Sequence, residues 1–192
     1  GNRNTALGQA ALRNNTTGND NVGIGYQALS SNTASGNVAV GSNALQNNIT
    51  GFSNSAVGIN ALASSVSASG VSAFGSYSLR LSTGNWNTAI GTRSSENNTT
   101  GIGNTALGNS ALQNNTTGSY NTAVGIEAFR NPAASYFNST ALGYNTVISA
   151  SNQVRLGNNA VTSIGGQVGW TTLSDARFKT ENATKVPGID FI

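Results

Sequence analysis

The side chains that most enzymes use for catalysis or metal binding are scarce in this 192-residue chain, which has no Cys and no His. Without them there is no thiolate or imidazole ligand for zinc, haem or iron–sulfur centres. Triads built on His and thiol nucleophiles are excluded for the same reason. We therefore expect no cofactor and no enzyme activity on an external substrate.

Four side chains could instead bind a sugar. Trp86 and Tyr120 offer flat rings that stack on the apolar face of a sugar, while neighbouring Asn and Gln side chains hydrogen-bond its hydroxyls. With Arg93 and Glu96 they make a candidate glycan-binding patch. The alternative is that they are scattered surface residues on a structural shaft.

Cleavage of a glycan needs two carboxylates within about 5–10 Å of each other. Glu96 and Glu127 lie in different positions of an internal repeat and about two repeats apart. Binding without hydrolysis is therefore the expectation.

The repeat that positions these residues is a pentapeptide, Asn-Thr-Ala-Leu-Gly in its first copy, which recurs along most of the chain. Such a regular period is typical of solenoid proteins. It argues against the disorder that 29 Asn and 24 Gly would otherwise suggest. The final glycines of the repeats are spaced 16 to 18 residues apart: Gly8, Gly25, Gly41, Gly58, Gly75, Gly91, Gly108, Gly125 and Gly143.

Each repeat alternates in residue type just before its glycine. The preceding residue is always apolar, the one before that is Ala or Gly, and the third is Thr, Ser or Val. This alternation predicts a short strand ending at each glycine. We expect the Thr and Leu side to fill the coil interior and the Ala side to pack against the backbone of another chain.

A second apolar column stands four residues after each glycine and should join the coil interior, with one interruption. Its members are Leu12, Leu29, Leu45, Leu62, Leu79, Ser95, Leu112, Phe129 and Val147.

These patterns predict an all-β fold, a parallel β-solenoid of about nine 17-residue coils over residues 1–143. A helical solenoid competes, but the Asn-Thr-Thr-Gly tracts favour turns over helices. So thin a coil buries little apolar surface alone, so association between chains is expected.

The repeat resembles the head repeats of trimeric autotransporter adhesins, whose strand reads Asn-Ser-Val-Ala-Ile-Gly, and those of phage tail fibres. The resemblance implies a left-handed β-roll packed as a homotrimer. It also implies an extracellular place on a cell surface or virion fibre, and a glycan or other surface receptor of a target cell as partner. Nucleic acid and membrane insertion are not expected, because the chain has neither a basic run nor a long apolar stretch.

Beyond the repeat, residues 144–172 are expected to form a terminal β cap. Three short strands are predicted there, at 154–157, 161–164 and 167–170. A repeat array needs such an atypical end.

The last segment, residues 173–192, holds the stretch Leu-Ser-Asp-Ala-Arg-Phe-Lys at 173–179. It is similar to the start of the endosialidase-type intramolecular chaperone that follows tail spikes and fibres. That resemblance implies self-cleavage before Ser174 in a longer precursor, with Ser174 as nucleophile and Lys179 as its base. An ordinary turn or helix N-cap at Ser174 is the alternative.

The sequence thus favours the distal part of a trimeric surface or tail fibre that acts in attachment to a target cell, with glycan binding as one route. A purely structural shaft that positions a separate receptor-binding domain is the first alternative. An ice-binding solenoid is the second, suggested by Thr pairs such as Thr16-Thr17. A calcium-binding β-roll is excluded, because it needs an Asp in every repeat and the chain has three in all.

Overall fold

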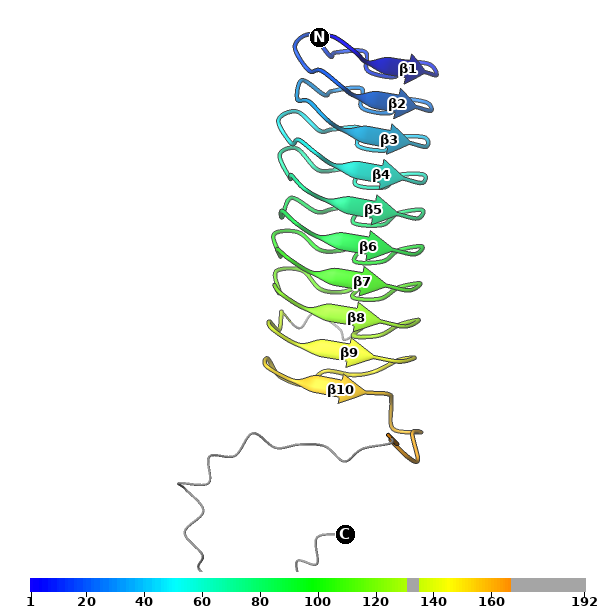
Figure 1. Ribbon diagram of the computed structural model, residues 1–192, viewed down its shortest axis with the longest axis vertical. Coiled ribbons are helices and arrows are strands. Elements are labelled where there is room, and N and C mark those ends of the chain that lie inside the picture. The colour runs from blue at the N-terminus through cyan, green and yellow to red at the C-terminus, as the bar shows by residue number, and fades with distance from the viewer. Residues whose placement is uncertain (131–134, 167–192) are drawn as a thin grey trace, which may run out of the picture. The chain divides into compact units, whose positions relative to one another are not determined.

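Ten short parallel strands, stacked in chain order, form one continuous sheet (Figure 1). The computed structural model describes residues 1–130 and 135–166. The strands are β1 (Thr5–Leu7), β2 (Val22–Ile24), β3 (Val38–Val40), β4 (Ser55–Val57), β5 (Ser72–Phe74), β6 (Thr88–Ile90), β7 (Thr105–Leu107), β8 (Thr122–Val124), β9 (Thr140–Leu142) and β10 (Val154–Leu156).

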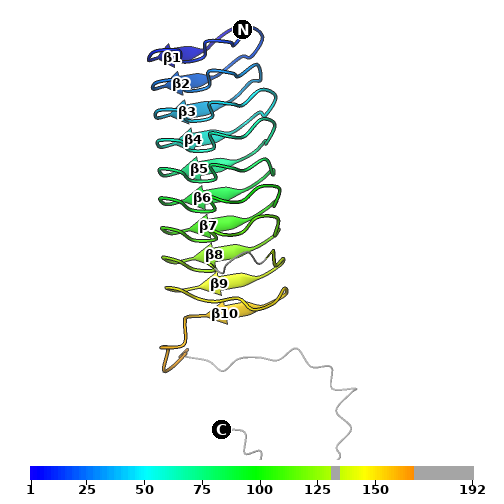
Figure 2. The ribbon, with the colours of Figure 1, turned by 180° about the vertical axis from the view of Figure 1, so that it is seen from behind.

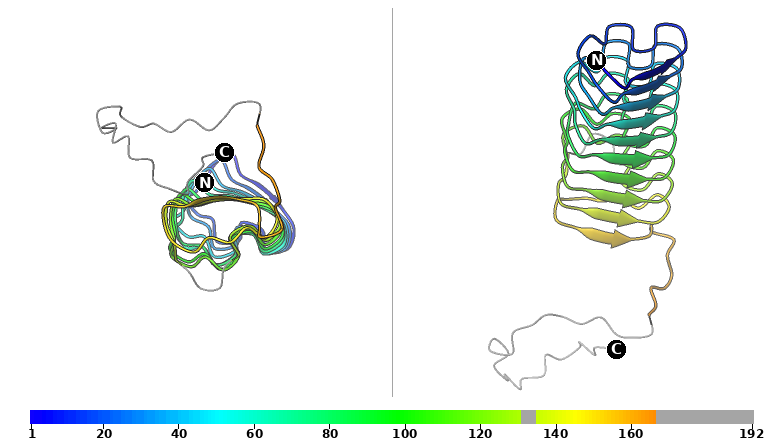
Figure 3. Two further views of the ribbon diagram at one scale, coloured as in Figure 1. Left: turned by 90° about the horizontal axis from the view of Figure 1, so that it is seen from below. Right: turned by 45° about the horizontal axis from the view of Figure 1, so that its top comes forward.

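Turns and loops close each coil and bring the chain back beneath the strand it has just left (Figures 2 and 3). Each strand pairs in parallel with the next, and equivalent repeat positions lie opposite one another, as Ala89 does with Ala106. The described residues contain no helix. The predicted β-solenoid is confirmed, and the helical alternative is wrong.

The expected orientation of the strands is wrong. The central Ala of each strand from β3 to β9 is fully buried within the single chain, whereas Ala6 in the first rung is exposed. The residues on either side of each Ala face outward instead, and the burial pattern of most strands reads half-exposed, buried, half-exposed or exposed. The coil is too narrow for larger side chains along this wall, so the small residue faces in.

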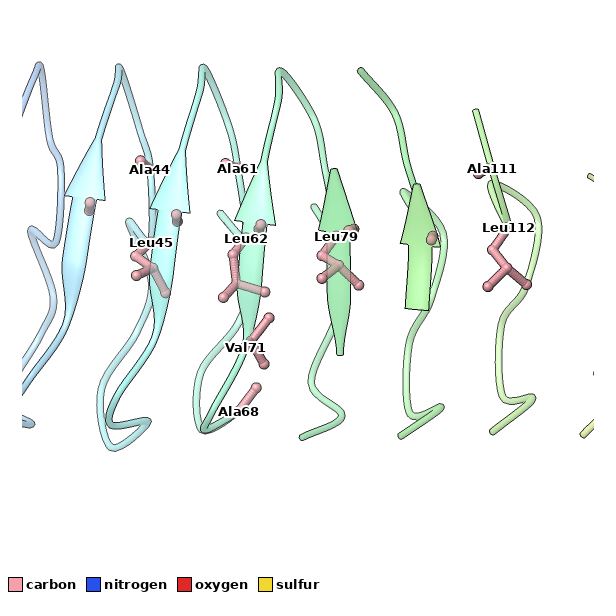
Figure 4. Close-up of a cluster of buried hydrophobic side chains, with 14 of the residues drawn as sticks. Ala44, Leu45, Ala61, Leu62, Ala68, Val71, Leu79, Ala111 and Leu112 are labelled. Atoms are coloured by element: carbon pink, nitrogen blue, oxygen red, sulfur yellow. The ribbon is translucent and has the colours of Figure 1, made fainter. Parts of the chain in front are cut away.

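The Leu column fills the rest of the interior (Figure 4). Leu29, Leu45, Leu62, Leu79 and Leu112 are fully buried. Each has a φ between +48° and +54°, in the left-handed region that a non-glycine residue rarely adopts. Burial of the side chain offsets that conformational cost at every coil.

The last member of the column was predicted at the wrong residue. Val147 is exposed, and Ile148 is fully buried in its place. Unlike the other column positions, Val147 does not have a positive φ. A β-branched side chain is poorly tolerated in the left-handed region, so the chain turns inward one residue later.

A ladder of buried Asn side chains connects successive coils just before the strands. Asn54 shows the pattern: its Oδ1 accepts from the backbone N–H of Val71 at 3.0 Å, and its Nδ2 donates to the Ala68 carbonyl at 2.7 Å. Its own backbone N–H donates to Oδ1 of Asn37 at 3.0 Å. Each amide thus satisfies backbone groups of the next coil that would otherwise be buried without a partner.

The glycine that ends each strand is required by close contact between coils. Gly58 has a φ of +134°, and a Cβ there would lie 2.6 Å from the Gly75 carbonyl group. No other residue fits both the conformation and the space.

The strand predicted at 154–157 is present as β10, where it forms the tenth rung of the sheet. In β10, Arg155 stands where the strands from β3 to β9 have an inward Ala. Among the described residues, β10 pairs only with β9. Residues 161–164, also predicted as a strand, are not one. The strand predicted at 167–170 lies outside the described residues.

All ten strands belong to one compact unit, Gly1–Thr162.

Candidate ligand-binding surface

Trp86 and Tyr120 stand at the same point of their coils, two residues before β6 and β8. Their side chains are among the most exposed large apolar groups of the described chain, at 65% and 62%. Both residues have a positive φ, +57° for Trp86 and +60° for Tyr120. The two rings therefore lie in one exposed column, two coils apart.

Each ring extends over a glycine of the preceding coil. A Cβ on Gly70 would lie 2.9 Å from Cδ1 of Trp86, and a Cβ on Gly103 would lie 3.0 Å from Cδ1 of Tyr120. The absence of a side chain at Gly70 and Gly103 allows the ring to lie close to the backbone of the neighbouring coil.

Arg93 and Glu96 belong to a separate cluster in the turn that follows β6. Glu96 is largely buried, and one carboxylate oxygen lies 3.2 Å from Nε of Arg80 while the other lies 3.9 Å from Nε of Arg93. That second oxygen also accepts from Nε2 of Gln113 at 3.1 Å. The guanidinium of Arg80 lies over the Tyr77 ring, 5.9 Å from its centre.

This ion cluster joins three successive coils, because Arg80, Glu96 and Gln113 occupy one repeat position and lie one coil apart. The structure brings Arg93 and Glu96 together. It places Trp86 and Tyr120 before β6 and β8, and Arg93 and Glu96 after β6.

One apolar feature was not predicted from the sequence, and a second was predicted on the wrong face of the sheet. Phe52 is 58% exposed and lies one position before the Trp86 column, on the coil of β4. Phe137 has the same position before β9 and is also exposed. Aligning the position three residues before each strand would have found both.

The other feature is the outer apolar rank, which consists of the last residue of every strand and faces outward. It was assigned to the coil interior because alternation along a strand identifies two faces without saying which one is inside. Its members are Leu7, Ile24, Val40, Val57, Phe74, Ile90, Leu107, Val124, Leu142 and Leu156.

A shallow hollow of about 290 Å³ lies at the last coil. It is lined by Asn145, Val147, Arg155, Gly157 and Asn158, with Asn159 and Ala160. Arg155 reaches back to Oγ of Ser149 at 3.2 Å.

Ser174 and Lys179 lie outside the described residues, so the cleavage motif stays a prediction. Within residues 1–130 and 135–166, no group of three acidic residues gathers to hold a metal ion. In that same part of the chain, no helix of membrane-spanning length and hydrophobicity occurs.

The chain matches no protein-family model, no curated protein and no solved structure.

Proposed function

We propose that this chain is a segment of a homotrimeric surface or tail fibre that acts in attachment to a target cell. The observation that supports this most is the outer apolar rank. Ten consecutive strands present an apolar side chain to the same outer face, and Leu7, Ile90 and Leu107 among them are 44–66% exposed. Five members of the rank are exposed and the other five are half-exposed. A row of apolar side chains that water reaches along its whole length marks an interaction site.

A second copy of the same chain is the partner that fits this rank. The rank has one apolar group per rung and no charged group along its whole length. Another copy carries the same groups at the same spacing, about 4.8 Å from strand to strand. Copies can therefore pack rung against rung, and the number three rests on the resemblance to trimeric adhesins and fibres.

The interior of each coil supports association through this face rather than through the Ala column. Buried Ala, Leu and Asn side chains already fill the interior of the coil. The apolar area left to bury lies on the outer face of the sheet. Burial contributes about 25 cal/mol for each Å² of apolar surface removed from water, so a rank of ten side chains is a large driving force.

Sedimentation equilibrium tests the trimer directly. We expect the wild-type chain to sediment as a trimer, and the double variant Ile90→Asp/Leu107→Asp as a folded monomer, because two charges per chain would be buried at the interface. Ile126→Asp is the matched control, since Ile126 is 55% exposed but lies after β8 rather than on the rank. A well-folded wild-type monomer would overturn the proposal.

Ice binding is the second candidate, supported by the outward residues that open the strands. Thr88, Thr105, Thr122 and Thr140 lie one above another on successive strands. Inhibition of ice recrystallisation by the purified chain would favour this function. A trimer that does not inhibit recrystallisation would exclude it.

A further inference from the structure

Exposed aromatic rings stand two or three positions before four of the strands: Phe52, Trp86, Tyr120 and, one rung after Tyr120, Phe137. We name Phe52, Trp86 and Tyr120 the aromatic ladder. They precede β4, β6 and β8, so each ring stands two rungs from the next. Two rungs of a parallel sheet measure about 9.6 Å, since neighbouring strands lie about 4.8 Å apart.

The backbone at two of these rings is strained without a compensating gain in burial. The residues equivalent to Trp86 and Tyr120 in other coils all have φ between +50° and +71°; they are Arg3, Asp20, Gly36, Ser53, Gly70, Gly103, Asn138 and Asn152. Gly, Asn and Asp tolerate this conformation, whereas a bulky aromatic residue there is an outlier.

The Leu column has the same unfavourable φ, but its side chains are fully buried. The rings of Trp86 and Tyr120 are mostly exposed. The conformational cost at these two rings is therefore not offset by burial of the side chain.

The surroundings of the ladder are polar and uncharged. Asn85 and Ser119 immediately precede the two rings, and both are only partly buried. From Ser35 to Asn152, the two columns that hold the ladder contain no charged residue. Flat rings beside amide and hydroxyl groups, without charge, fit a neutral sugar.

We infer that the aromatic ladder binds an extended neutral β-linked polysaccharide lying parallel to the solenoid axis. Two rungs are about the length of one disaccharide in such a chain, so every second sugar would stack on a ring. This inference rests on the proposed attachment function and names the class of ligand. Rings that repeat on every second rung, with Gly70 and Gly103 on the rungs between them, suit a periodic polymer better than a protein partner, which needs a contiguous apolar patch.

The test is titration of the purified chain with β-1,4-linked oligomers of glucose and of N-acetylglucosamine, two, four and six units long, by calorimetry. Six units reach all three rings and two units reach one. We expect affinity to rise about tenfold for each added ring, which corresponds to about 1.4 kcal/mol. Equal affinity at all lengths, no binding to either series, or binding only to an acidic polysaccharide would overturn the inference.

Two variants and one control locate the site. Trp86→Ala and Tyr120→Ala should each weaken hexamer binding at least tenfold. Tyr144→Ala should leave it unchanged, because Tyr144 is equally exposed at 61% but follows β9. A comparable loss in Tyr144→Ala would contradict the assignment.

Stability separates a binding role from a packing role. Trp86→Gly and Tyr120→Gly relieve the positive φ, so their melting temperatures should not fall below that of the wild type. A fall of several degrees in both would show that the rings serve packing. Sedimentation of the same samples distinguishes the two proposals: a trimer without glycan binding overturns the ladder alone, and a monomer that binds overturns the trimer alone.

Discussion

Ala106 and Leu107 are neighbours in β7, yet Ala106 is fully buried while 45% of Leu107 is exposed. The inward wall of the coil accepts only the smaller of the two side chains. Ala106→Leu should therefore lower the free energy of unfolding by about 1–3 kcal/mol, as overpacking does in other cores. Chemical denaturation of the variant and the wild type measures this. A variant as stable as the wild type would show that the wall has room.

The interruption of the Leu column at Ser95 predicts a stabilising substitution. Ser95 is buried, its Oγ has no hydrogen-bond partner, and its φ of +48° matches that of the Leu residues above and below. Ser95→Leu should raise the free energy of unfolding by about 1–2 kcal/mol, through burial of an apolar side chain and removal of the unpaired hydroxyl. A loss of stability would mean that this coil cannot accommodate the added volume.

The Asn ladder predicts a large cost for removing one amide. Asn104 accepts from the backbone N–H of Asn121 at 3.0 Å and donates to the Gly118 carbonyl at 2.8 Å. Asn104→Ala leaves the buried backbone N–H of Asn121 without this partner, at about 1–3 kcal/mol, while the Gly118 carbonyl still accepts from Nδ2 of Asn115 at 2.9 Å. Asn109→Ala is the control, because Asn109 is exposed, and it should change the unfolding free energy by less than about 0.5 kcal/mol.

The exposed pair at the first two coils predicts a local dependence on pH. The hydrogen bond from Arg3 lowers the pKa of Asp20 below its usual value. The contribution of the pair is therefore present above the ordinary pKa of an Asp, near 3.9, and is lost as the pH falls through the lowered pKa. The protection of the β1 backbone amides against hydrogen exchange should decrease on acidification. In Asp20→Asn the decrease should be smaller than in the wild type. An identical pH response in the variant would assign the effect to other groups.

Much of the fold was readable from the period of the sequence. The nine glycines located the strands, and β1 to β9 each end at the residue before one of them. Column alignment also found the buried Leu residues. It could have found the Arg80–Glu96 pair, since residues one coil apart are neighbours in any solenoid.

The sequence did not predict which face of each strand points into the coil. That is decided by backbone conformations that residue types alone do not indicate. Leu79 and Tyr77 adopt a positive φ that their side chains disfavour, because burial of the Leu and closure of the coil outweigh the local cost. That curl places Ala89 inside and Ile90 outside. Trp86 and Glu96, ten residues apart in sequence, lie before and after β6. Period and column identity are thus local properties of the sequence, whereas inside and outside depend on how a whole coil closes.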